Sequence, residues 1–115
     1  KEIKAEAERK DAELRKNIAN AKKLLIGTWR DNNSLYTYKA DGTGVYKFDN
    51  GNEIISDWDV DGDILIEKII KSKKGNSAWK PSTQINRYKI VHVDENSSIM
   101  KALDSGTTYT AKRIK

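Results

Sequence analysis

The chain has 115 residues, of which 37% are hydrophobic and 34% charged, and it carries a net charge of +5. A chain of this length has room for one domain with one core. It contains no cysteine, which excludes disulfides, thiolate nucleophiles and cysteine-ligated zinc, and no apolar run approaches the roughly 18 residues of a membrane-spanning helix.

The positive charge is concentrated at the start of the chain. Residues 1–25 hold eight Lys or Arg against five Asp or Glu, whereas residues 26–115 hold fourteen against twelve. The second segment is therefore close to neutral. Because a protein that binds the nucleic-acid backbone needs a concentrated basic face, this distribution weakens the case for a nucleic-acid function.

Residues 1–25 are rich in Ala, Glu, Lys, Arg and Leu and contain no Gly or Pro, which predicts one charged helix. A narrow apolar stripe follows one side of it, made of Ile3, Ala7, Leu14, Ile18, Ala21 and Leu25. Its bulky members gather toward the end, so we expect a solvated helix whose last turns dock against the rest of the protein. A tether or coiled-coil arm and an amphipathic helix on a membrane surface are the alternatives.

Residues 26–115 have the pattern of short β-strands separated by turns. Period-two alternation predicts strands at about 26–31, 34–40, 43–49, 53–60, 63–72, 82–93, 97–104 and 107–114. Turn signals such as Asp41-Gly42 and Asp61-Gly62 make most connections too short for anything but antiparallel hairpins. In an open meander the first and last strands each have one edge with unpaired main-chain groups, and closing the sheet into a barrel removes both edges. We therefore expect a mainly β fold: an eight-stranded antiparallel up-and-down barrel after an N-terminal α-helix.

The strand expected at 53–60 shows the alternation clearly. Trp58 and the other even-numbered residues share one face, whereas Asp57 and Asp59 take the other. We expect Trp58 to face inward, where its ring would fill much of a narrow barrel.

The same stretch contains half of a calcium-loop pattern. Asp57, Asp59, Asp61 and Gly62 match its first half, in which alternating carboxylates surround a hard cation. Lys68 stands at the twelfth position, where a bidentate glutamate belongs. We therefore predict solvent-facing carboxylates followed by a turn, and no metal site, with a weak cation site as the alternative.

Acidic and basic residues form two successive blocks. Residues 49–67 contain seven acidic and no basic residues, and residues 68–93 contain seven basic and no acidic ones. Because neighbouring strands of a meander lie side by side, we expect opposite charges to pair across them. The alternative is a docking patch for an anionic partner. Its residues would be Trp79 with Lys68, Lys71, Lys73, Lys74 and Lys80.

Trp79 stands in the one long connection, residues 73–82, where hairpin geometry requires no tryptophan. It is either a lid or partner anchor at the barrel rim, since loops at a barrel mouth carry recognition, or a plug folded over the barrel end.

His92 is the only histidine, and we expect it to be packed or hydrogen-bonded. No nucleophile motif accompanies it, so we predict no catalytic residue, no enzyme activity and no cofactor.

Several short motifs occur in a familiar order. They are Gly27-Thr28-Trp29 after the helix, the hairpin Asp41-Gly42-Thr43, the Trp58 strand ending in Asp61-Gly62-Asp63, Tyr88-Lys89-Ile90, and a basic last strand. Over residues 24–115 the chain resembles the small bacterial lipocalin-like domains of the calycin group. The resemblance implies a barrel in which Trp29 closes one end and Arg113 of the last strand lies over its ring as a structural contact.

The resemblance also implies an exported, non-enzymatic binding module at the cell envelope or in the periplasm. The helix would be a spacer from a lipid anchor upstream, and we expect a monomer. The partner would be a protein or a small apolar ligand. Because the strands are short, we expect side chains, and not a ligand, to fill the interior. The candidate ligand-binding or partner-binding residues are Tyr36, Tyr38, Trp58, Lys73, Lys74, Trp79 and Lys80.

The alternative function is a basic barrel that binds single-stranded nucleic acid. Aromatic rings among lysines serve this role on five-stranded OB barrels. The larger number of strands expected here and the scarcity of arginine speak against it.

Overall fold

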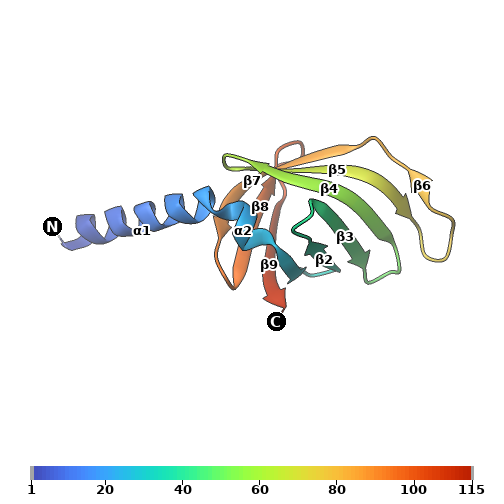
Figure 1. The fold of residues 1–115 in the computed structure, drawn as a ribbon. Helices are drawn as coiled ribbons and strands as arrows, with labels where there is room; N and C mark the ends of the chain where they lie inside the picture. Colours follow the sequence, from blue (N-terminus) through green and yellow to red (C-terminus); the bar gives the residue numbers. More distant parts are fainter. Residues whose placement is uncertain (1, 115) are drawn as a thin grey trace.

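Two helices precede the strands in the computed structural model, which describes residues 2–114. They are α1 (Glu2–Ala19) and α2 (Ala21–Leu25). α1 projects away from the rest of the protein (Figure 1), and the molecule measures 60 × 28 × 24 Å along its principal axes. The described helices include none that is long and apolar enough to cross a membrane.

The sequence predicts one continuous helix, and the structure corrects this at Asn20. Asn20 has φ −103° and ψ 13°, outside the helical values, and its Nδ2 amide donates to the carbonyl of Lys16 at 3.0 Å. An asparagine side chain that bonds back to the preceding turn competes with the regular helical ladder. The helix is therefore interrupted at Asn20, and α2 begins after it.

Within residues 2–114, nine strands follow the helices. They are β1 (Gly27–Arg30), β2 (Ser34–Tyr38), β3 (Thr43–Phe48), β4 (Glu53–Asp61), β5 (Ile64–Lys73), β6 (Lys80–Pro81), β7 (Ile85–Val93), β8 (Ser97–Ala102) and β9 (Thr108–Ile114). Eight of them lie where the alternation predicts strands. The ninth, β6, is a two-residue strand that pairs with Lys71 and Ser72 of β5.

The strands close into a barrel. Their order is β4-β3-β2-β1-β9-β8-β7-β5-β6, and a further β4–β5 pairing joins the two sides. Every pairing is antiparallel, including the one between β1 and β9 that brings the first and last strands together. The predicted eight-stranded antiparallel barrel is confirmed, with β6 as a short extension beside β5.

The barrel has two different ends. At the helix end lie α2 and the turns 39–42, 62–63 and 94–96. At the open end lie the turns 31–33, 49–52 and 103–107 and the loop 74–79. Figure 1 shows α1 and α2 on one side of the barrel and the far ends of β4, β5 and β6 on the other.

The helix end is closed by a packed core. Ala21 and Leu25 of α2 are buried together with Trp29 of β1, and Ile18 and Leu24 pack against them. Burying the apolar end of an amphipathic helix is what holds such a short helix in place. The bulky end of the predicted stripe therefore docks, whereas the side chains of Ile3 and Ala7 lie outside the described residues.

The inward and outward faces alternate as predicted. In β4, Ser56 and Trp58 are buried and Asp57 and Asp59 are exposed. Two register irregularities interrupt the ladder, between Ile55 and Ser56 in the β4–β5 pair and at Val91 in the β7–β8 pair. A bulge of this kind shifts the side-chain alternation by one residue and bends the strand.

Candidate functional site

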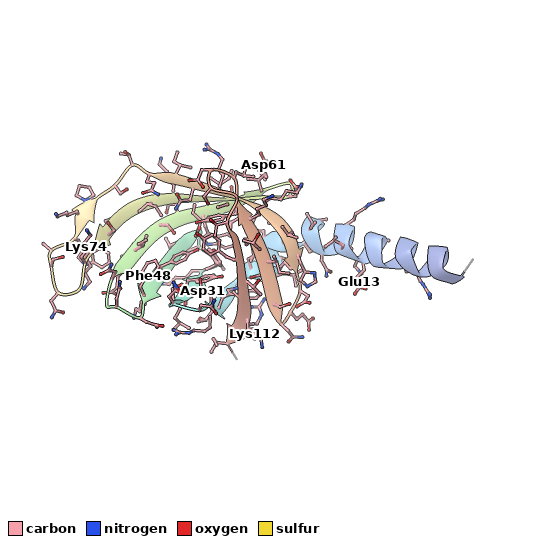
Figure 2. All side chains as sticks on the ribbon, turned by 180° about the vertical axis from the view of Figure 1, so that it is seen from behind. Glu13, Asp31, Phe48, Asp61, Lys74 and Lys112 are labelled. Carbon is pink, nitrogen blue, oxygen red and sulfur yellow. The ribbon has the colours of Figure 1, made fainter. Side chains whose placement is uncertain are left out.

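The open half of the barrel contains a cavity of about 170 Å³. All five tyrosines of the chain line it, together with its single phenylalanine, Phe48, and its single methionine, Met100. The tyrosines are Tyr36, Tyr38, Tyr46, Tyr88 and Tyr109. Figure 2 shows Phe48 and Lys74 on the side of the barrel away from α1, and Asp61 nearer to α1.

The expectation that side chains fill the whole interior is therefore wrong for this half. Leu25, Trp29 and Trp58 fill the helix end, and all three are nearly inaccessible to solvent. At the open end the tyrosine rings contact one another, and the rings of Tyr36 and Tyr46 are stacked with their centres 4.7 Å apart and their planes at 15°. The cavity lies among these rings.

A buried glutamate lies in the wall of the cavity. Glu67 is 1% exposed and comes from β5, where the alternation turns it inward between Leu65 and Ile69. The hydroxyl of Tyr46 donates to its Oε2 at 2.7 Å, and that of Tyr38 does so at 3.3 Å. The hydroxyl of Tyr88 is a third hydrogen-bond partner of this carboxyl group. A carboxylate offers about four lone-pair sites, so Glu67 keeps acceptor capacity beyond its tyrosine partners.

Burial changes the protonation of this group. Loss of water raises the pKa of Glu67 to about 7, while the hydroxyls of Tyr46, Tyr38 and Tyr88 favour the charged form and limit the rise. The same burial, with the nearby charge of Glu67, raises the pKa of Tyr38 and Tyr46 well above the ordinary value of 10.0. The tyrosines therefore remain hydrogen-bond donors while the glutamate titrates near neutral pH.

Asp31 is a second carboxyl group of the cavity wall, at the mouth. Its Oδ1 accepts bonds from the main-chain N–H of Asn33 at 3.0 Å and of Ser34 at 2.7 Å, and from the hydroxyl of Ser34 at 2.8 Å. These bonds fix the turn between β1 and β2 and hold the carboxylate at the entrance. Among the described residues that line the cavity there is no Lys, Arg or His.

A wider hollow of about 400 Å³ adjoins the cavity and shares Phe48 and Ile54 with it. Lys73 and Lys74, two of the predicted binding residues, line this hollow. Lys73 is paired with Glu53 across the strands at 2.9 Å. The predicted lysines therefore lie at the outer rim, outside the cavity itself.

The structure divides the other predicted binding residues into two groups. Tyr36 and Tyr38 line the cavity. Trp58 lies behind it in the packed half, where its Nε1 donates to the carbonyl of Lys39 at 3.0 Å and its ring lies 5.0 Å from that of Tyr38. Trp58 therefore supports the cavity wall without lining the cavity.

Trp79 lies beside β5, outside the cavity. The Nζ atoms of Lys71 and Lys73 each lie 5.1 Å from the centre of its ring. Lys71 pairs with Ile55 and Lys73 pairs with Glu53. Because Ile55 and Glu53 lie on the outer face of β4, both lysines point outward. The plug over the barrel end is thus not the arrangement found, and the exposed Lys80 begins β6 next to this contact.

Arg113 and Trp29 meet at the helix end. The guanidinium carbon lies 4.4 Å from the centre of the indole ring. The same guanidinium donates to the carbonyls of Glu95 at 2.7 Å, of Ile26 at 2.8 Å and of Leu24. The contact that the lipocalin resemblance implies for these two residues is therefore present in the structure.

The charge blocks form ion pairs between strands. Glu53 pairs with Lys73 and Asp63 pairs with Lys89 at 2.6 Å. Asp59 reaches instead to Lys22 of α2 at 2.8 Å, which ties the helical arm to β4. Within the described residues no three ligand-type side chains come together at a metal-binding distance.

His92 lies at the helix end, on β7. Its Nε2 is 2.8 Å from Oδ2 of Asp94. Main-chain N–H groups of Asn96 and Ser97, followed by His92, lower the pKa of Asp94 to about 2. This pair belongs to the turn before β8 and lies at the opposite end of the barrel from the cavity.

Sequence reasoning missed Glu67, Tyr46, Tyr88, Tyr109 and Asp31 as site residues. A signal for Glu67 was present, because a lone acid occupies the inward phase of the alternating run from Ile64 to Lys73. No local signal shows that the five tyrosines meet, since they come from four different strands. Comparisons with protein-family models, with curated proteins and with solved structures found no match to this chain.

Proposed function

We propose that this protein is a non-enzymatic binding module of the lipocalin type, which holds one small molecule in the cavity at the open end. The observation that carries the proposal is the convergence of all five tyrosines and one buried glutamate on a single cavity in a barrel closed at its other end. Concave sites with apolar walls and a few polar groups are the usual form of small-molecule sites.

The size of the cavity limits the ligand. An apolar cavity of about 150 Å³ holds a benzene molecule, and the cavity here has about 170 Å³. A molecule with one ring and a short substituent would fit inside. A long acyl chain would have to extend through the mouth into the hollow lined by Phe48 and Ile54.

The resemblance to bacterial lipocalin-like domains supports a further proposal about location. The protein would be exported and act at the cell envelope, with the helical arm as a spacer. The projection of α1 from the barrel suits that role (Figure 1). The mouth of the cavity is at the end away from α1, so an anchor at the arm would leave the entrance accessible.

A protein partner or a single-stranded nucleic acid would have to use the outer rim around Trp79. Its ring is covered by the ammonium groups of Lys71 and Lys73, and Lys73 is also paired with Glu53. A stacked base or a partner side chain would have to displace these contacts. The cavity is therefore the better supported site.

The test is binding of one-ring compounds, followed by NMR with the full chain. A panel that includes indole, 2-phenylethanol and 2-phenylethylamine should contain a compound that binds with one-to-one stoichiometry and shifts signals of the tyrosines in the cavity. Ile69→Trp should abolish this binding, because Ile69 lines the cavity. Its neighbour Ile70, which is 40% exposed, supplies the matched control Ile70→Trp, which should bind normally.

Two results would overturn the proposal. The first is the absence of saturable binding for every compound in the panel. The second is binding that shifts signals only outside the cavity. Both can be read with the unmodified protein, so the test does not depend on whether Ile69→Trp folds; melting curves report that separately.

A further inference from the structure

The electrostatic character of the cavity is opposite to that of the chain. The chain has 22 Lys and Arg residues and a net charge of +5. Of the described residues that line the cavity, two are acidic, Asp31 and Glu67, and none is basic. An anionic ligand would meet two carboxyl groups with no counter-charge, so the cavity disfavours it.

Glu67 lacks a cationic partner within the described structure. The bonds it accepts come from hydroxyl groups of tyrosines, Tyr46 at 2.7 Å and Tyr38 at 3.3 Å. A carboxyl group in such a position is costly to bury in its charged form unless a positive charge pairs with it. Two lysines of the open end, Lys73 and Lys74, line the outer hollow and not the cavity, and Lys73 is already paired with Glu53. The missing positive charge can be brought by a ligand.

The tyrosine rings supply the second half of such a site. Tyr36 stacks on Tyr46 at 4.7 Å, and Tyr88 meets Tyr109 edge to face at 6.1 Å. The faces of tyrosine rings attract cations within about 6 Å of the ring centre, most strongly where water is excluded. Rings and carboxylate together form the combination that recognises an organic ammonium group.

Resting on the proposed function, we propose that the ligand of the cavity is a small organic cation: one apolar ring that carries a protonated amine, with Glu67 as its counter-charge and the tyrosine rings around it. The amine would donate to the carboxylate of Glu67, and the ring would pack against Met100 and Ile69 in the wall. Asp31 at the mouth would attract the cation toward the entrance.

The groups that face Glu67 determine how binding depends on pH. Tyr36 and Tyr38 face it from β2, Tyr46 from β3 and Tyr88 from β7, and all four remain protonated because burial and the charge of Glu67 raise their pKa. Asp31 is the other charged group of the lining. Affinity for the cation should therefore rise between about pH 5 and pH 8 as Glu67 loses its proton.

The experiment compares three probes of nearly equal size by calorimetry on the full chain: 2-phenylethylamine, 2-phenylethanol and 3-phenylpropanoate. At about pH 8 the amine should bind about tenfold or more tightly than the alcohol, and the anion should bind most weakly. Glu67→Gln keeps the shape and an acceptor for the tyrosines, and should remove the preference for the amine. Asp57→Asn removes one carboxylate from the outer face and should leave that preference unchanged.

Each outcome is decisive. Equal affinity of the amine and the alcohol in the unmodified protein overturns the inference, as does an amine affinity that does not rise with pH; neither result needs a variant. Binding of the alcohol or the anion alone leaves the cavity as a binding site and overturns only the inference that its ligand is a cation. Binding of none of the three, together with failure of the larger panel, removes the proposed function as well.

Discussion

The guanidinium of Arg113 lies over the ring of Trp29, 4.4 Å from its centre, and donates at the same time to the carbonyls of Leu24, Ile26 and Glu95. One side chain of the last strand thus joins β9 to the first strand, to the end of α2 and to the turn before β8. The place where a closed barrel must join its two chain ends is therefore secured by a side chain as well as by the β1–β9 ladder.

We expect Arg113→Ala to lower the free energy of unfolding by about 3 kcal/mol, from a cation–π contact of about 1–2 kcal/mol and the loss of hydrogen bonds to three carbonyls. Arg113→Lys keeps the charge but not the planar guanidinium with its forked N–H donors, so it should recover only part of the lost free energy of unfolding. Urea unfolding measures both. A lysine variant as stable as the unmodified protein would contradict the role given to the fork.

Gly27→Ala should destabilise the same region for a reason that involves Arg113. Gly27 has φ of 136°, and a Cβ placed on it would lie 2.5 Å from Nη1 of Arg113. The cost should be about 2–4 kcal/mol, from backbone strain and displacement of the guanidinium.

Gly42→Ala is the control for this variant. Gly42 also has a positive φ, 92°, but a Cβ placed on it would meet no atom within 4 Å, so this change reports strain alone and should cost less. In the double variant with Arg113→Ala, the cost of Gly27→Ala should shrink, because the clash is gone. Additive costs in this cycle would show that Gly27 and Arg113 do not interact.

The parts of the structure that follow local rules could be predicted from the sequence. Alternation along β4 places Trp58 inside and Asp57 outside, and short turns require antiparallel neighbours. The cavity could not be predicted, because it depends on which rings meet across the barrel. Tyr46 and Glu67 are 21 residues apart in the chain, but the hydroxyl oxygen of Tyr46 lies 2.7 Å from Oε2 of Glu67. No local sequence pattern indicates such a contact.

Ser56 provides a test of the packed half of the barrel. It is completely buried, and its hydroxyl has no hydrogen-bond partner among the described residues. Because a buried unpaired hydroxyl costs about 1–3 kcal/mol, we expect Ser56→Ala to leave stability unchanged or to raise it by about 1 kcal/mol. Ser34→Ala should instead destabilise, since the equally buried hydroxyl of Ser34 donates to Asp31 at 2.8 Å. Thermal melts would contradict this account if Ser56→Ala were the more harmful change.

Glu67 should make the stability of the protein depend on pH in an unusual direction. Its pKa is raised from 4.5 to about 7 in the folded protein. Between these values the folded state binds more protons than the unfolded state, so the free energy of unfolding must fall as pH rises. The stabilisation is fully present below about pH 4.5 and is lost by about pH 7, a difference on the order of 3 kcal/mol.

Urea unfolding at a series of pH values measures this dependence, and Glu67→Gln isolates it, because the amide cannot titrate. The difference in stability between the two proteins should shift in favour of the glutamine variant as pH rises from about 5 to 8. The pKa of Asp94 is lowered from 3.8 to about 2, so Asp94 contributes stability that is lost only as pH falls through the range between these values. That range lies below the pH values at which Glu67 titrates. A pH-independent difference between the two proteins would mean that Glu67 titrates normally, and that the cavity does not hold its carboxyl group away from water.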